Sequence, residues 1–172
     1  MVKQYIISTL VENKPGVLHK VSNMFRARGF NIDSISVGPT EKSDISRMII
    51  TIGGDSTLVE QLVKQLRKLI DIIDVTVLDR NRTVYRELAL IKINTPTSKA
   101  RSEMIGYANI FRSRVVDVSQ NHITVEVTGT PDKIDAFMGL ASTYGIKELA
   151  RTGVTALIRE GSHIERANEA FE

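Results

Sequence analysis

The chain contains no cysteine and no tryptophan among its 172 residues. The absence of cysteine excludes disulfides, thiolate zinc sites and thiol catalysis, and it suits the reducing cytoplasm, where we expect the protein to act. No apolar run approaches the roughly 20 residues of a membrane-spanning helix, and the charged, alternating N-terminus does not resemble a signal peptide. These absences indicate a soluble globular protein of one medium domain or two small ones.

Basic residues slightly outnumber acidic ones, 23 to 20, which gives a net charge of +3. A basic balance can indicate a nucleic-acid-binding protein, but here the two signs are interleaved along the chain. The five Phe and four Tyr, without Trp, leave little aromatic surface for base stacking. We therefore expect neither a nucleic acid nor a membrane among the partners.

The first half of the chain has the pattern of a split βαβ unit. Strands are expected at residues 4–12, 30–38, 45–54 and 71–79. Between the first two, apolar residues recur at the 3.6-residue period of a helix, which Gly29 ends, and Asp55 or Ser56 caps a second such helix. The order βαββαβ predicts an antiparallel sheet with two helices on one face, which is the ferredoxin-like fold.

The same order of elements recurs after a polar linker at residues 80–83. Short similar sequences support the repeat, because FRAR in the first unit and FRSR in the second occur at the same place in each unit. We predict an α+β protein of two consecutive ferredoxin-like βαββαβ domains, residues 1–79 and 84–160, with a flexible tail at 161–172. One face of each sheet would carry no helix, so we expect another subunit or the sister domain to cover it, with a homodimer as the default.

The sequence contains no recognisable catalytic motif. It lacks a phosphate-binding glycine loop, a dinucleotide fingerprint and a nucleophile elbow. The three histidines, His19, His122 and His163, fall in different elements without metal-ligand spacing. Acidic residues are scattered over helix exteriors and strand ends. We therefore expect no catalytic residues and no metal site in this chain.

One turn, Asn13–Leu18, has the chemistry of an anion-binding site. A helix start leaves backbone N–H groups free and carries a partial positive charge. Gly16 has no side chain, so an anion can approach these groups, and Pro15 fixes φ at a position whose N–H would be spare. The alternative is that Pro15 and Gly16 only turn a strand into a helix, and the turn alone does not decide between the two.

The segment from Glu12 to Asp55, which contains this turn, resembles the regulatory (small) subunit of acetolactate synthase, also called acetohydroxyacid synthase. The resemblance continues through RELALIKI, NIFRSRVVDVS and ELARTGVTALIR and covers nearly the whole chain, except the tail beyond Arg159. It implies an N-terminal ACT domain over residues 1–79, for effector binding and dimerisation, followed by a C-terminal ACT-like domain.

The resemblance also implies a function without chemistry in this chain. The family's regulatory subunit stimulates a separate catalytic (large) subunit, which carries thiamine diphosphate, magnesium and FAD. That subunit condenses pyruvate with pyruvate or 2-oxobutyrate, on the route to valine, leucine and isoleucine. No cofactor is implied for the present chain. The regulatory subunit confers feedback inhibition, usually by valine bound at the interface of an ACT homodimer.

The resemblance places the effector in the turn described above. The candidate binding residues are Asn13, Pro15, Gly16, Val17, Leu18, Asn31, Ile32 and Ile35. The N–H groups of residues 16–18 would face the carboxylate, and Asn31 would come from the facing subunit. Val17, Ile32 and Ile35 are candidates for an apolar wall, although packing in the core explains each of them equally well.

Two other functions remain open at this point. The chain could be a free-standing ACT-repeat sensor of amino acids that controls another enzyme or transcription. It could also be a small ferredoxin-like enzyme or an RNA-binding module, which the missing catalytic cluster and the few aromatic residues disfavour. A nucleotide effector, known for some relatives, is a further possibility.

Overall fold

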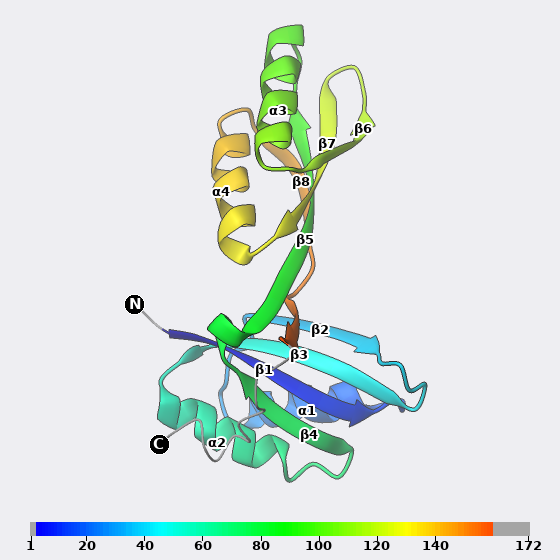
Figure 1. Cartoon of the computed structure of the whole chain (residues 1–172), viewed down its shortest axis with the longest axis vertical. Coiled ribbons are helices and arrows are strands. Elements are labelled where there is room, and N and C mark those ends of the chain that lie inside the picture. The colour runs from blue at the N-terminus through cyan, green and yellow to red at the C-terminus, as the bar shows by residue number, and fades with distance from the viewer. Residues whose placement is uncertain (1–2, 160–172) are drawn as a thin grey trace. The chain divides into compact units, whose positions relative to one another are not determined.

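The computed structural model describes residues 3–159, which form two compact units. The first unit contains the described residues up to Val84 together with the segment from Gly153 onward, and the second contains Tyr85–Thr152. Each unit has the βαββαβ order of the ferredoxin-like fold (Figure 1). None of the helices within residues 3–159 is long and apolar enough to cross a membrane.

The first unit is an antiparallel four-stranded sheet with strand order β2-β3-β1-β4 and two helices. Its elements are β1 (Lys3–Glu12), α1 (Val17–Ala27), β2 (Ser34–Pro39), β3 (Ile45–Gly54), α2 (Ser56–Leu66) and β4 (Ile72–Leu78). The Asp55 side chain caps α2, since it accepts a hydrogen bond from the N–H of Leu58 at 2.8 Å. Gly29 follows α1 with a φ of 68°, the left-handed conformation that ends many helices.

The core of this unit lies between the helices and one face of the sheet. Alternate residues of the strands, such as Ile7 and Ile50, pack against Phe25 of α1 and Leu62 of α2, and all four side chains are buried. Each such side chain contributes about 1.5–3 kcal/mol relative to its exposed state. The intervening strand residues point to the opposite face of the sheet.

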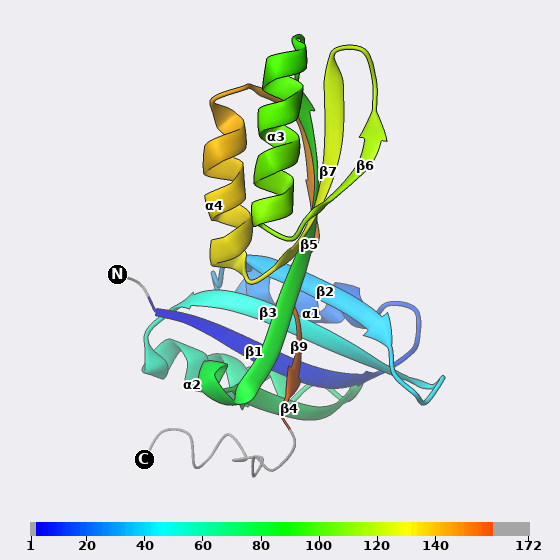
Figure 2. The same ribbon diagram turned by 45° about the horizontal axis from the view of Figure 1, so that its top comes forward.

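That opposite face is covered in part by a strand from near the end of the described chain, β9 (Thr155–Ile158), which lies across it (Figure 2). Val154 and Ala156 are both 3% exposed, and Ile6 and Ile49 on the sheet are both 1% exposed. A Cβ atom on Gly153 would lie 2.7 Å from the backbone oxygen of Ile35, so the segment that leads into β9 approaches β2 closely. The first unit therefore includes residues far apart in the sequence.

The second unit repeats the architecture with strand order β6-β7-β5-β8, and β9 also pairs with β5. After the short 3-10 turn η1 (Arg80–Arg82), its elements are β5 (Thr83–Asn94), α3 (Ser98–Ile110), β6 (Arg114–Val118), β7 (His122–Gly129), α4 (Pro131–Ser142) and β8 (Ile146–Arg151). Ile91, Val125 and Phe137 lie at the centre of its core. The α3 start is capped by Thr97, whose hydroxyl accepts from the N–H of Ala100 at 3.1 Å.

The structure corrects the domain limits expected from the sequence. Residues 84–160 were expected to form one domain closed by a single strand, but that strand is split into β8 and β9. The described segment from Gly153 to Arg159 packs with the first unit, because Val154 and Ala156 bury their side chains on its sheet. The expected linker at 80–83 contains η1 and the first residue of β5. The expected tail at 161–172 lies outside the described residues.

A second correction concerns Asn31 and Ile32, which were expected on a strand over 30–38. The strand β2 begins only at Ser34. The N–H of Phe30 still closes the end of α1 by donating to the carbonyl of Phe25 at 3.0 Å, and the ladder to β3 starts where Asp33 donates to Thr51 at 2.9 Å. Asn31 and Ile32 therefore lie in the connection between α1 and β2.

Candidate effector site

Asn13 holds the predicted binding turn against the loop between β2 and β3. Its backbone N–H donates to the carbonyl of Asp44 at 2.8 Å, and its side-chain Nδ2 donates to the carbonyl of Ser43 at 2.9 Å. Because Asn13 directly follows β1, these two bonds tie the end of β1 to the start of β3. The turn is thus fixed at one end of the sheet, next to the last residues of β2.

Gly16 is the N-cap of α1 and has a φ of 89°. This left-handed conformation favours glycine, so the backbone gives a reason for the residue. A Cβ atom at Gly16 would meet nothing within 4 Å, so the space in front of the helix start is open. Pro15 was expected as the first helical residue, but the helix begins at Val17 and Pro15 precedes the cap. Its fixed φ shapes the entry to the turn.

The start of α1 offers two backbone donors. Within the described residues, the N–H groups of Leu18 and His19 make no hydrogen bond, whereas that of Lys20 closes onto the carbonyl of Gly16 at 3.0 Å. The N–H of Val17 contacts the carbonyl of Lys14 at 3.5 Å. No side chain caps α1, and its first turn contains no acidic residue. A carboxylate from outside the unit could therefore take the place of a cap.

The lysines near the turn are already paired with carboxylates. Lys14 contacts Glu12 at 2.9 Å, and this hydrogen bond raises the pKa of Lys14 above its ordinary value. Lys20 contacts Asp71 at 2.6 Å, and the Asp71 side chain is largely buried. Because these charges offset one another, the backbone N–H groups and the helix dipole supply most of the attraction for an anion at this turn.

Asn31 lies at the other end of β2 from the Asn13–Leu18 turn. The ladder pairs Ser34 with Thr51 at one end of β2 and Pro39 with Ser46 at the other, beside the end of β1. Six strand residues span about 20 Å at roughly 3.4 Å per residue. The side chain of Asn31 is exposed and donates only to Asp33 at 3.2 Å. One subunit therefore does not bring Asn31 to the turn.

The predicted apolar wall is largely part of the core. Val17 is 4% exposed, and Ile32 and Ile35 are partly buried against the first unit's core. Leu18 at the start of α1 and Val37 on β2 are each 47% exposed. Val37 was not among the residues expected at the site. Its position on β2, the edge strand of the sheet, is a signal that only the strand order provides.

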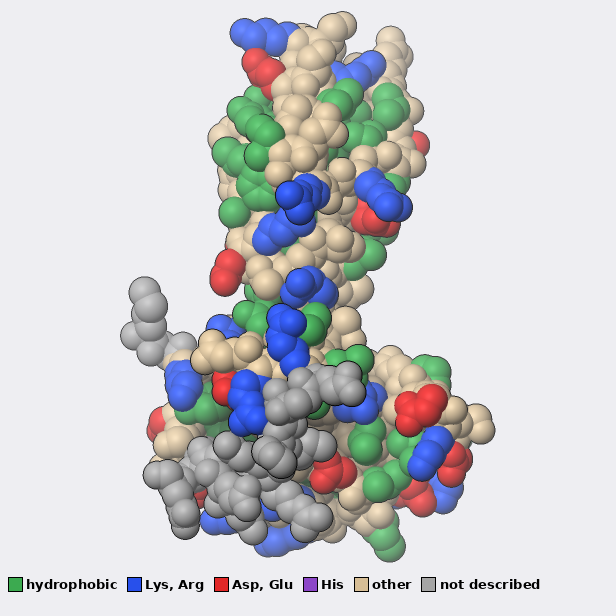
Figure 3. Space-filling view, viewed as in Figure 1, with side chains coloured by type: hydrophobic (Ala, Val, Ile, Leu, Met, Phe, Trp, Pro, Cys, Tyr) green, Lys and Arg blue, Asp and Glu red, His purple; other side chains and the backbone are tan. Residues whose placement is uncertain are grey.

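The described residues contain no cluster typical of metal binding. Their His, Asp and Glu side chains form no group of three that could hold a metal ion. His19 is exposed and contacts the amide of Asn23 at 2.7 Å on the same helix. On the visible face of the first unit, basic and acidic side chains are interspersed (Figure 3).

Comparison with known proteins matches both units. Residues 7–74 match the family model described as an AHAS small subunit-like ACT domain, and residues 86–160 match the model for the small subunit of acetolactate synthase. A protein of Methanothermobacter thermautotrophicus named as a probable acetolactate synthase small subunit is 55% identical over 155 residues, which cover 90% of this chain and 92% of that protein. The acetolactate synthase small subunit of Aquifex aeolicus is 48% identical over 168 residues, covering 98% and 88%.

The solved structures give the same result. The crystal structure of the acetolactate synthase small subunit from Thermotoga maritima superimposes with a TM-score of 0.86 at 39% identity, and the match covers 94% of this chain and all of that one. This agreement confirms the predicted α+β fold of two ferredoxin-like units, the first of them an ACT domain. The chain therefore belongs to the family of acetolactate synthase small subunits.

Proposed function

We propose that this protein is the subunit that makes acetolactate synthase responsive to valine, or to a related branched-chain amino acid. It stimulates a catalytic large subunit that carries thiamine diphosphate, magnesium and FAD. It carries no cofactor and performs no chemistry of its own. The observation that carries the proposal is the placement of the Asn13–Leu18 turn and Asn31 at opposite ends of the edge strand β2.

The edge of β2 is the natural surface for a homodimer. In the strand order β2-β3-β1-β4, one side of β2 pairs with β3 and the other has no partner strand among the described residues. An unpaired edge favours pairing with another strand. A two-fold axis across this edge would place two β2 strands antiparallel, because an interface between identical subunits uses the same patch twice.

This pairing would assemble the effector site. The end of β2 near Pro39 in one subunit would lie beside the beginning of β2 near Ser34 in the other. The turn of one subunit would then face Asn31 of the partner subunit, and the dimer would have two equivalent sites. The α-carboxylate would accept hydrogen bonds from Leu18 and His19 N–H, Asn31 would contact the polar groups, and Leu18 and Val37 would contact the isopropyl group.

The second unit has no equivalent of this site, because the start of α3 is capped by the chain's own Thr97. We therefore assign effector binding to the first unit. Ligand bound across the β2 edge would change the dimer and, through it, the response of the catalytic subunit. The free-standing sensor is the alternative function, and it would bind the amino acid without changing acetolactate formation.

A mixed dimer tests whether two subunits build each site. Chains carrying Gly16→Asp and chains carrying Asn31→Ala are co-expressed with different tags, and the doubly tagged dimer is purified. One of its two sites combines both defects, whereas the other combines an intact turn with an intact Asn31. We expect neither variant homodimer to bind valine at the turn, as reported by the amide NMR signals of Leu18 and His19, and the mixed dimer to bind one valine there per two chains.

Tagged wild-type dimers, with two valines per two chains at the turn, are the control. If the mixed dimer binds no valine at the turn while both variants remain folded, each site lies within one subunit and the proposed assembly is wrong. If both variant homodimers bind valine as the wild type does, the turn and Asn31 are not the effector site.

A further inference from the structure

The sheet face opposite the helices of the first unit contains a groove of about 400 Å³ beside β9. Its walls come from β2 and the following turn, from β3, and from β9. This volume is within the range of small-molecule sites. Of the lining residues only Val37 also belongs to the proposed effector site, and none belongs to the Asn13–Leu18 turn or to Asn31 and Ile32, so the groove is largely separate from that site.

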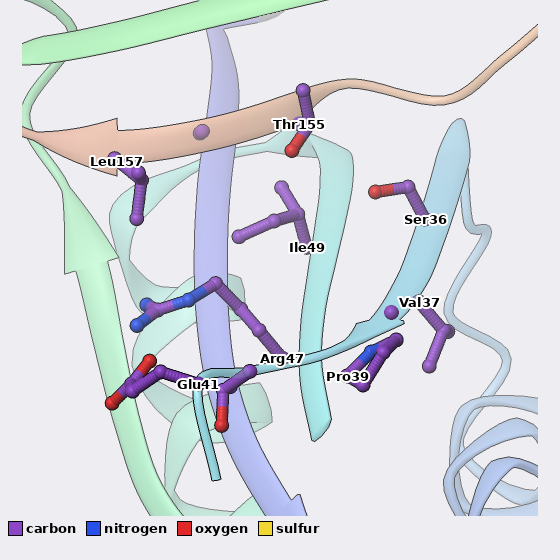
Figure 4. A pocket seen from close by; sticks show the side chains of 11 residues that line it. Ser36, Val37, Pro39, Glu41, Arg47, Ile49, Thr155 and Leu157 are labelled. Carbon is purple, nitrogen blue, oxygen red and sulfur yellow. The ribbon is translucent and has the colours of Figure 1, made fainter. Parts of the chain in front are cut away.

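Two side chains of opposite charge line this groove without pairing with each other. Arg47 on β3 donates from Nη1 to the hydroxyl of Ser8 at 3.0 Å, and Ser8 is 4% exposed, so the guanidinium is anchored on the sheet. Within residues 3–159 neither Arg47 nor Glu41 makes a salt bridge. Figure 4 shows their charged groups on the same side of the groove.

The rest of the lining combines apolar side chains with the hydroxyl groups of Ser36, Thr40 and Thr155. Ile49 forms part of the lining and is 1% exposed, whereas Leu157 is 59% exposed although it is a large apolar side chain. Ser36 and Thr155 present their hydroxyls across the groove from each other (Figure 4). The groove thus offers apolar contacts together with polar groups that could orient a small ligand.

We infer that this groove binds a second molecule of a zwitterionic α-amino acid with an apolar side chain. The Arg47 guanidinium retains N–H donors for the α-carboxylate, and the Glu41 carboxylate accepts from the α-ammonium. The apolar side chain contacts Ile49, Pro39 and Leu157. A ligand of one charge alone would leave either Arg47 or Glu41 without its counterpart.

The groove remains available in the proposed dimer. Hydrogen bonds at the edge of β2 lie in the plane of the sheet, whereas Ser36 points out of that plane toward β9. Because Thr155 and Leu157 of β9 form one wall, a bound ligand contacts both the sheet and β9 and holds them together. The site therefore links amino-acid binding to the docking of β9, which follows directly on the second unit.

The test uses the full chain carrying Gly16→Asp, which removes the proposed effector site. L-valine, L-leucine and L-isoleucine are titrated by calorimetry, and methyl NMR signals of Ile49 and Leu157 report on the groove. We expect at least one of the three to bind once per chain and to shift both signals. Arg47→Gln should weaken this binding about tenfold or more through loss of charge-assisted hydrogen bonds. Lys42→Gln removes an equal charge from the same turn and should change nothing.

A second comparison tests the recognition of the ammonium group. The 2-oxo acid analogue of each amino acid lacks that group, so it should bind the groove about tenfold more weakly than the amino acid, and Glu41→Gln should abolish this difference. Absence of shifts at Ile49 and Leu157 with all three amino acids at millimolar concentration overturns the inference. Equal losses of amino-acid affinity in Arg47→Gln and Lys42→Gln also overturn the inference. Equal affinity for the amino acid and its oxo acid overturns the assignment of a zwitterionic ligand. Because the effector turn is already disabled, none of these results bears on the proposed function.

Discussion

Gly153→Ala tests whether β9 is a structural part of the first unit. A Cβ atom at this position would lie 2.7 Å from the backbone oxygen of Ile35, 2.8 Å from its carbonyl carbon and 3.1 Å from its nitrogen. These neighbours are backbone atoms of β2, so they cannot rotate away as a flexible side chain would. Either β9 or β2 must shift.

The expected destabilisation follows from the contacts that such a shift disturbs. Forcing an extra carbon into a packed site typically costs about 1–3 kcal/mol. The neighbouring Val154 and Ala156 are both 3% exposed, so a displaced β9 would also return apolar surface to water. With a slope of about 1–3 kcal/mol per molar urea, we expect the urea midpoint of the first unit to fall by roughly 1 M.

The assay is urea unfolding followed by circular dichroism, with amide exchange of β2 and β3 to separate the first unit from the second. Gly139→Ala in α4 is the matched control. A Cβ atom there meets nothing within 4 Å, and alanine in a helix is favoured over glycine by about 0.5–1 kcal/mol. If Gly153→Ala leaves exchange in β2 and β3 unchanged, the packing of β9 on the sheet does not contribute to stability as the structure indicates.

Three further predictions concern the site and the domains. Gly16→Asp should fold, because a left-handed aspartate costs at most about 1–2 kcal/mol and its charge at the helix start recovers about 0.3–1 kcal/mol. In a valine titration of the reconstituted enzyme it should raise the required valine at least tenfold, and unchanged inhibition would mean that Pro15 and Gly16 form only a turn. Truncation after Arg80 should yield a less stable protein that binds a hydrophobic dye, because it removes β9 from Ile6 and Ile49. Appending residues 153–159 to the truncated chain through a flexible linker should restore its stability. Equal thermal stability of the truncated chain with and without these residues would contradict the structural role of β9. The purified chain should form no acetolactate from pyruvate with thiamine diphosphate, magnesium and FAD, and turnover by the pure protein would show that it has an active site of its own.

The fold could be predicted from the sequence because local patterns determine most of it. The alternation of Ile7 with its neighbours and the helical period through Phe25 both describe elements that bury one face. The same patterns repeat after residue 83, so two units were expected and found. These features depend on residues close together in the chain, which is why a single sequence is sufficient to recognise them.

The sheet on which β9 packs could not be predicted in the same way. Val154, Ala156 and Ile158 alternate like the residues of any half-buried strand, and nothing in that period says which sheet receives them. The position of Gly153 against Ile35 depends on a contact between residues more than a hundred positions apart. Tertiary packing decides such contacts, so the sequence suggested a single closing strand where the structure has two.

Part of the geometry at the candidate site could be expected from the sequence. The role of Gly16 was expected from its lack of a side chain, and its φ of 89° gives a second reason for glycine. The proposal that the His19 N–H is a donor follows only from the start of the helix at Val17. Arg47 and Glu41 were not singled out, because they come from a strand and a turn that only the folded chain brings to one groove.

The most direct test of the central claim is acetolactate formation by the catalytic large subunit, measured without this protein, with it, and with it in the presence of valine. The account predicts that adding this protein raises the rate and that valine lowers the raised rate toward that of the catalytic subunit alone. If the rate is the same in all three mixtures although the two proteins form a complex, the protein is not the regulatory subunit proposed here.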